Sequence, residues 1–233
     1  IDKEFYNFRA IGFYCCKIIK LLIDKGANVN IKSKENANFN STPLIFAISR
    51  NDNLEIVELL LKKGADVNFK GYYNWSPLMY AIKEKTITDI TYAKLLLKYG
   101  ADVNAIKGDT TGIGGAHLEQ PTPLILAVQK GNLELVKLLI RNGADINRKG
   151  FWGSILGQSE TLPLIEALNP NIPNNLEILK LLIKSGADVN IKIHSIDNSV
   201  RQGVANNRSA INFARSDNNQ AAVELLLQAG AQE

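Results

Sequence analysis

The chain has 233 residues, of which 45% are hydrophobic and 21% are charged, and its formal net charge is +4. This balance allows a large apolar core and excludes a chain that is disordered by composition. The sequence holds no stretch of about 18 apolar residues, so it predicts no transmembrane helix and no membrane partner.

The cysteines and the basic charge exclude further classes. Cys15 and Cys16 are adjacent, so they support neither a disulfide framework nor a zinc site, and we expect Cys16 to pack in the core. The pI near 8.9 comes largely from Lys and Arg on solvated helix faces. Because no basic cluster is interleaved with aromatic residues that could stack on bases, we expect no nucleic-acid partner.

A five-residue motif, Gly-Ala-Asp/Asn-Val/Ile-Asn, ends one predicted helix after another along the chain. The helix before it is apolar except for a polar stripe at helical spacing, as with Glu55, Glu58 and Lys62 in segment 54–62. The first such helix is predicted at residues 16–23. A glycine in left-handed conformation ends a helix without strain. The copies lie at residues 26–30, 64–68, 100–104, 143–147 and 186–190, with a broken sixth copy at Gly230 and Ala231.

A Thr/Ser-Pro-Leu triplet begins another helix between successive copies of this motif. The hydroxyl can cap the helix, and proline fits its first position. The triplet stands at residues 42–44, 76–78 and 122–124 and decays at 162–164 and 209–211, and an alanine follows it each time: Ala47, Ala81, Ala127, Ala167 and Ala214. A unit of two helices and a turn cannot bury its own apolar faces, so the sequence predicts a stacked array.

This pattern resembles the ankyrin repeat family, whose unit of about 33 residues carries a Thr-Pro-Leu-His-x-Ala signature. The resemblance covers nearly the whole chain and implies an all-α solenoid of helix-turn-helix units with β-hairpin-like fingers. We expect one domain of about six repeats, including a degenerate first unit, over residues 1–30, 31–68, 69–104, 105–147, 148–190 and 191–233. The signature histidine is replaced throughout by Ile45, Met79, Ile125, Ile165 and Asn212.

Three long insertions separate a glycine stop from the next triplet, at residues 105–121, 148–161 and 191–208. The resemblance identifies these segments as hairpin fingers, which we expect to be enlarged. The glycine-rich segment 108–115 lacks the Lys-Ser/Thr end of a phosphate-binding loop, so it is typical of a flexible finger tip.

The sequence offers no pattern of catalytic residues. His117 and His194 lie in inserted segments without a matching set of metal ligands, and no Ser, Cys and His arrangement indicates a nucleophile. We predict that the chain is not an enzyme and uses no cofactor, no metal and no small-molecule substrate.

Large aromatic residues lie where the resemblance places variable partner contacts, just before the triplets. Tyr72, Tyr73 and Trp75 precede the second triplet, and tryptophan and tyrosine are common interface anchors. Packing against neighbouring fingers is an equally open interpretation. Phe39 lies in the preceding finger. Phe151 and Trp152 open a later finger, where local packing is the favoured alternative.

The resemblance also implies a binding rim at the exposed end of each first helix. The residues there are polar: Ser49 and Arg50, Lys83 and Glu84, Gln129 and Lys130, and Ser216 and Asp217. Simple solvation is an equally open interpretation of each.

These observations predict a non-enzymatic module that binds a protein partner through its concave face and enlarged fingers. Two alternatives stay open: a targeting segment of a larger multidomain enzyme or secreted effector, and a structural spacer. Because the chain begins at Ile1 rather than Met, we expect a piece of a longer protein. Many Asn, Ile and Lys residues suggest an AT-rich genome and a bacterial source in contact with host cells. The partner would then be a host protein, and both a cytoplasmic and a secreted location remain open.

Overall fold

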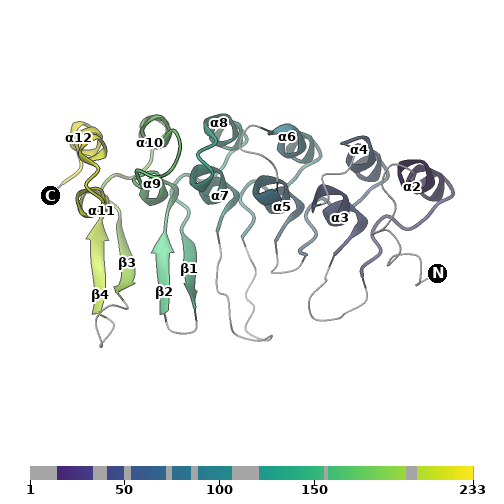
Figure 1. Ribbon diagram of the computed structural model, residues 1–233, viewed down its shortest axis with the longest axis horizontal. Coiled ribbons are helices and arrows are strands. Elements are labelled where there is room, and N and C mark those ends of the chain that lie inside the picture. Colours follow the sequence, from purple (N-terminus) through teal and green to yellow (C-terminus); the bar gives the residue numbers. More distant parts are fainter. Residues whose placement is uncertain are drawn as a thin grey trace.

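The computed structural model of the chain describes residues 15–33, 41–49, 54–71, 75–84, 89–106, 121–154, 157–197 and 204–232. Its helices lie in two parallel rows, and the connecting segments project from one side of them (Figure 1). We name the row next to these segments the inner row and the other the outer row. Consecutive pairs, one helix from each row, follow one another from end to end of the molecule, so it is an elongated stack.

The described helices alternate between the rows along the chain. The inner row consists of α3 (Pro43–Ser49), α5 (Pro77–Glu84), α7 (Pro123–Gln129), α9 (Pro163–Glu166) and α11 (Ala210–Ser216). The outer row consists of α2 (Cys15–Asp24), α4 (Leu54–Lys62), α6 (Thr91–Lys98), α8 (Leu133–Arg141), α10 (Asn175–Lys184) and α12 (Gln220–Gln228). The predicted helix at residues 16–23 is confirmed, as is the pairing of helices in each later unit.

The two motifs act as predicted at the start of α7 and at the end of α8. The Thr122 hydroxyl accepts a hydrogen bond from the Ile125 N–H at 3.2 Å, and Pro123 occupies the first helical position. Ile125, at the place of the signature histidine, is fully buried. At the other end of the unit, Gly143 has a φ of 85° and so closes the outer helix in the left-handed conformation.

The core runs the length of the stack as a single cluster of buried side chains. The alanine that follows each triplet is at most 4% exposed, as at Ala81 and Ala127. The last residue of each triplet is at most 2% exposed: Leu44, Leu78, Leu124, Leu164 and Ile211. Because each pair of helices covers the next, the predicted stacked array is confirmed.

Asparagine side chains join the turn of each unit to the turn of the next. The Asn104 amide donates to the Gly143 carbonyl at 3.0 Å, and its oxygen accepts the Asp145 N–H at 2.8 Å. The same two bonds connect Asn30 with Gly64 and Asp66, Asn68 with Gly100 and Asp102, Asn147 with Gly186 and Asp188, and Asn190 with Gly230 and Gln232. The broken sixth copy therefore continues the series.

Two of the three predicted fingers are antiparallel hairpins. Strand β1 (Gly150–Ser154) pairs with β2 (Gly157–Thr161), and β3 (Lys192–Asp197) pairs with β4 (Val204–Ser209). They extend side by side from the inner row (Figure 1). Most of the insertion at 105–121 lies outside the described residues. The shorter fingers are closed at their bases, since the Gly71 N–H donates to the Trp75 carbonyl at 2.9 Å.

Candidate functional site

The inner helices and the bases of the fingers together form one side of the stack. We call this surface the inner-helix face. Two positions of each unit lie at this side: the residue three positions after the start of the inner helix and the residue that precedes the helix cap. The first set is Phe46, Tyr80, Leu126, Glu166 and Phe213, and the second is Ser41, Trp75, Pro121, Thr161 and Arg208. Leu126, Trp75, Pro121 and Thr161 are buried there, and the other members of the two sets are half-buried.

Trp75 is the centre of a cluster on this face. Its indole ring lies 5.9 Å from the Tyr80 ring, centroid to centroid, at an interplanar angle of 59°. The Lys83 ammonium lies over the same indole, 4.6 Å from its centroid, which is a favourable cation–π arrangement. The Lys130 ammonium, from the next unit, donates to the Lys83 carbonyl. The cluster therefore brings together two amines from successive units, of which Lys83 lies over the Trp75 ring.

Trp75 is not the exposed anchor that one of the two open interpretations requires, since its side chain is 7% exposed and belongs to the hydrophobic core. Packing against a neighbouring finger is not shown either, because its ring contacts are with Tyr80 and Lys83 of α5 in the same unit. Pro121 and Thr161, at the corresponding positions of later units, are also buried. The finger bases at Trp75, Pro121 and Thr161 are thus buried, whereas Ser41 and Arg208, at the same position of other units, are half-buried. The Trp75 ring lies under the exposed Lys83.

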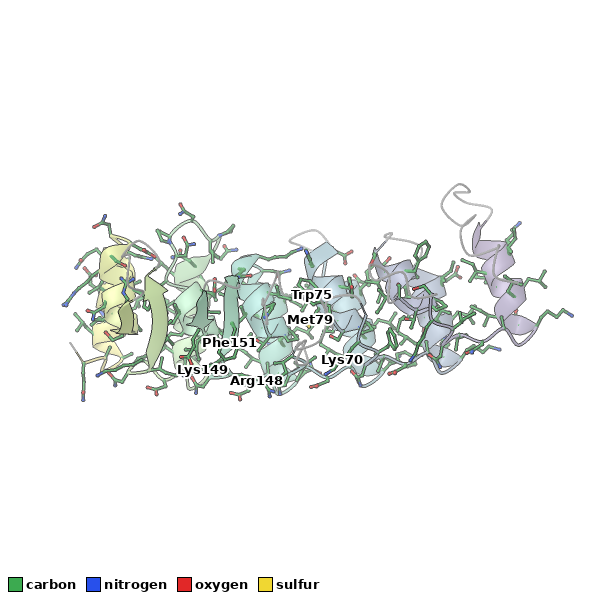
Figure 2. All side chains as sticks on the ribbon, turned by 90° about the horizontal axis from the view of Figure 1, so that it is seen from below. Lys70, Trp75, Met79, Arg148, Lys149 and Phe151 are labelled. Atoms are coloured by element: carbon green, nitrogen blue, oxygen red, sulfur yellow. The ribbon has the colours of Figure 1, made fainter. Side chains whose placement is uncertain are left out.

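The other predicted contact residues divide into two groups. Lys83 is exposed, while Gln129, Lys130 and Phe151 are half-buried, and Figure 2 shows Trp75 and Phe151 on the side from which the fingers project. The others have side chains outside the described part of the chain: Phe39, Arg50, Tyr72, Tyr73, Glu84 and Trp152. His117 and the side chains of Cys16 and His194 also lie outside it.

A second cation–aromatic contact at the carboxyl end of the stack was not predicted. The Arg208 guanidinium lies 4.3 Å from the centroid of the Phe213 ring and donates to the Ser216 hydroxyl at 2.7 Å. Arg208 stands immediately before the cap Ser209, as Trp75 stands before Ser76. That shared position is the signal by which the sequence could have identified it.

Several of the described charged groups form surface ion pairs. On α8, Lys137 donates to Glu134 at 2.7 Å, and this hydrogen bond holds the pKa of Glu134 below its ordinary value. On α4, the hydrogen bond with Glu58 raises the pKa of Lys62. Across the described ranges, no group of three or more His, Cys, Asp or Glu residues could hold a metal ion. Of the helices in those ranges, none is long and apolar enough to cross a membrane.

Comparison with known proteins identifies the family of the chain. No curated protein matches the sequence. A family profile described as ankyrin repeats (3 copies) matches residues 8–107 and again residues 111–193. These ranges include the helices from α2 to α10, the glycine turns up to residue 190 and the first hairpin. Such repeats are typically non-catalytic binding modules. With most of its length matched, this stack of paired helices and fingers belongs to the ankyrin repeat family, whose repeats serve as protein-binding modules.

Proposed function

We propose that this chain is a non-catalytic protein–protein interaction module that holds a protein partner on its inner-helix face and enlarged fingers. The observation that carries the proposal is the cluster around Trp75, where Lys83 and Lys130 come from adjacent units of the stack. The stack fixes these groups before the partner arrives, so binding orders few side chains and loses little conformational entropy.

The proposed contact surface comprises the polar ends of the inner helices and the aromatic residues of the fingers. Trp75 is omitted as a contact because it is buried, and it supports the surface through Lys83. The residues that we propose to touch the partner are Phe39, Arg50, Tyr72, Tyr73, Lys83, Glu84, Gln129, Lys130, Phe151 and Trp152. We also propose that the chain is one domain of six units, because the asparagine bonds continue to the sixth turn.

Affinity capture with matched variants tests this function. A Tyr72→Ala, Tyr73→Ala and Lys83→Ala variant should lose a partner that the unchanged chain retains, by at least about tenfold, because two anchors and one amine are removed. The control replaces Glu177 and Lys180 with alanine on the exposed face of α10 and should retain the partner. Circular dichroism must show equal folding of both variants. Full retention of the partner by the first variant contradicts the proposal.

The origin of the partner is a narrower prediction from composition. We propose a host protein as the partner and a bacterium as the source, because the sequence is rich in Asn, Ile and Lys. Identifying the captured protein by mass spectrometry tests this statement separately from the binding surface.

A further inference from the structure

A row of basic residues follows the glycine turns at the point where each finger begins. The residue two positions after the bridging asparagine is a lysine in four of the five complete motif copies. We call these residues and the neighbouring Arg148 the finger-base row: Lys32, Lys70, Arg148, Lys149 and Lys192. Arg148 is half-buried and the lysines are exposed. Because the asparagine bonds hold successive turns in register, the row runs along one edge of the stack.

The ends of the outer helices add to the charge of this edge. A basic residue stands in the last turn of each outer helix from α4 to α10: Lys62, Lys98, Arg141 and Lys184. In Figure 2, Lys70, Arg148 and Lys149 lie toward one edge of the stack, whereas Trp75 lies closer to its middle. The net charge of the whole chain is only +4, so this concentration of cations makes the edge electropositive relative to the rest of the molecule.

Nearby acidic residues offset only part of this charge. The Asp102 carboxylate accepts the Asn104 N–H at 2.8 Å, and the corresponding aspartates of the other turns do the same. Lys149 pairs with Glu160 at 2.8 Å. The Lys32 ammonium lies over the Phe69 ring, 5.3 Å from its centroid. Because the ring carries no net charge, this contact does not neutralise the positive charge of Lys32.

The row is interrupted at one position, and a hollow lies there. In the third motif copy the lysine is replaced by Ile106, which is 36% exposed. The hollow has a volume of about 350 Å³. Its lining is Asn68, Lys70, Ser76, Asp102, Asn104, Ala105, Ile106 and Arg148. It therefore combines an apolar part, from Ala105 and Ile106, with a cation from the unit on either side.

We propose that the finger-base row docks an acidic segment of a partner protein, with one apolar side chain of that segment in the hollow between Lys70 and Arg148. The proposal rests on the proposed function, since it names the chemistry of a protein partner, but none of the cations in the finger-base row is among the contact residues proposed above. Cations along the edge attract carboxylates, while Ile106 offers contact to an apolar group. Nucleic acid suits the hollow less well, because Ile106 and Ala105 provide no aromatic ring on which a base could stack.

Binding of a defined probe tests the proposal without knowledge of the partner. The probe is a fluorescein-labelled peptide with a leucine between two runs of glutamate, and its anisotropy is followed over a salt series. We expect binding that weakens as salt rises. Lys70→Gln together with Arg148→Gln should weaken it by at least about tenfold. Replacing the peptide leucine with serine should weaken binding to the unchanged chain but not to an Ile106→Ser variant.

Two controls separate this site from general attraction and from the inner-helix face. Lys94→Gln with Lys180→Gln removes the same charge from the middle of outer helices and should change the affinity less than about twofold. Lys83→Gln with Lys130→Gln alters the inner-helix face and should leave peptide binding unchanged. If that variant loses partner capture but still binds the peptide, the result supports both proposals, because the two sets of lysines then act separately.

Three results overturn the proposal. The first is no peptide binding at low salt. The second is equal weakening by the Lys70/Arg148 and the Lys94/Lys180 variants, which would show attraction to net charge alone. The third is tighter binding of a single-stranded oligothymidine of equal charge under the same conditions, which would assign the edge to nucleic acid. If instead the inner-helix face captures no partner, the peptide measurement still decides this proposal.

Discussion

Single side chains in the turns connect each unit of the stack to the next. Within the motif, the Asp145 carboxylate accepts the N–H of Asn147, two residues on, while the Asn104 side chain reaches across to Gly143 and Asp145 of the following unit. An asparagine amide can do this because it carries a donor and an acceptor on one rigid group. The side chain of the last motif residue therefore bonds between units, whereas the side chain of the third bonds within its own turn.

Replacing Asn104 with alanine should lower the free energy of unfolding by about 1–3 kcal/mol, because two hydrogen bonds between units are lost. Urea denaturation followed by circular dichroism measures this change. Asn142→Ala is the matched control, since the Asn142 amide bonds only to Leu138 of its own helix. Equal destabilisation by the two variants would show that the bonds between units stabilise the fold no more than the Asn142 bond within one unit does.

Two glycines with positive φ should differ in their tolerance of alanine. A Cβ at Gly143 meets nothing within 4 Å, so Gly143→Ala should cost only the strain of the left-handed conformation, about 1–2 kcal/mol. A Cβ at Gly131 would lie 2.8 Å from Pro173 Cβ and closer still to the Pro173 carbonyl oxygen. Gly131→Ala should therefore lower the melting temperature more than Gly143→Ala does. The reverse order in a thermal scan would contradict this close approach of the two loops.

The pKa of Glu134 should depend on the presence of Lys137, its ion-pair partner on α8. Lys137 lowers this pKa in the folded state, so the pair contributes stability above the unfolded-state pKa, and that contribution is lost as pH falls through the folded pKa. In a Lys137→Gln variant the pKa of Glu134 should rise, as an NMR titration of the side-chain carboxyl carbon would show. Lys17→Gln on α2 should leave it unchanged. An unaltered titration in the first variant would mean that the pair does not form in solution.

At the scale of elements, equivalent helices are covered to different degrees. Counted back from the glycine stops, Ile18 and Leu22 of α2 correspond to Leu135 and Leu139 of α8. The first two are 49% and 39% exposed, whereas the second two are 3% and 0% exposed. The same apolar stripe is therefore core in the middle of the stack and surface on α2, because only a covering neighbour removes it from water.

This difference predicts unequal effects of the same substitution. Leu135→Ala should lower the free energy of unfolding by about 2–5 kcal/mol, the range for a buried side chain that leaves a cavity. Ile18→Ala should lower it by less than about 1 kcal/mol, since much of that side chain is already in water. Denaturant titration of both variants provides the measurement. A large loss in Ile18→Ala would mean that α2 is covered in solution.

At the scale of the whole molecule, the stability of each helix pair depends on the pairs that pack next to it. Each described unit is joined to the next by core packing and by one bridging asparagine, so the free energy of opening depends on how many covered neighbours a helix has. The basic edge is also a property of the assembled stack, since Lys32, Lys70 and Lys149 belong to different units that the turns hold in register.

The protection of backbone amides in native-state hydrogen exchange should therefore vary along the stack. Amides of α7 and α8 should be the most protected, because this pair lies in the middle of the described pairs, farthest from both ends of the stack (Figure 1). Amides of α2 should exchange fastest among the described helices, since Ile18, Leu21 and Leu22 are exposed. Uniform protection in all helices would indicate a single cooperative unit and contradict the neighbour-by-neighbour account.

Local chemistry made much of the fold predictable. The hydroxyl at Thr122, the ring of Pro123 and the glycine at 143 act within a few residues of the chain, and the structure places a helix start or stop at each. The excess length between landmarks located the insertion at residues 148–161, and the resemblance to ankyrin repeats implied the hairpin that β1 and β2 form there. The burial of Trp75 did not follow, because its neighbours Tyr80 and Lys83 come from the helix that packs back against the finger base.

The sequence by itself determined the repeating unit, its helix boundaries and the stacked architecture, since these depend on backbone preferences and on apolar periodicity over short distances. Only the tertiary structure decided which side chains share a surface. Lys70, Ile106 and Arg148 lie in three successive motif regions, and they line one hollow because the asparagine bonds fix the register of the turns. Register between units is set by contacts across more than thirty residues, and no local pattern encodes it.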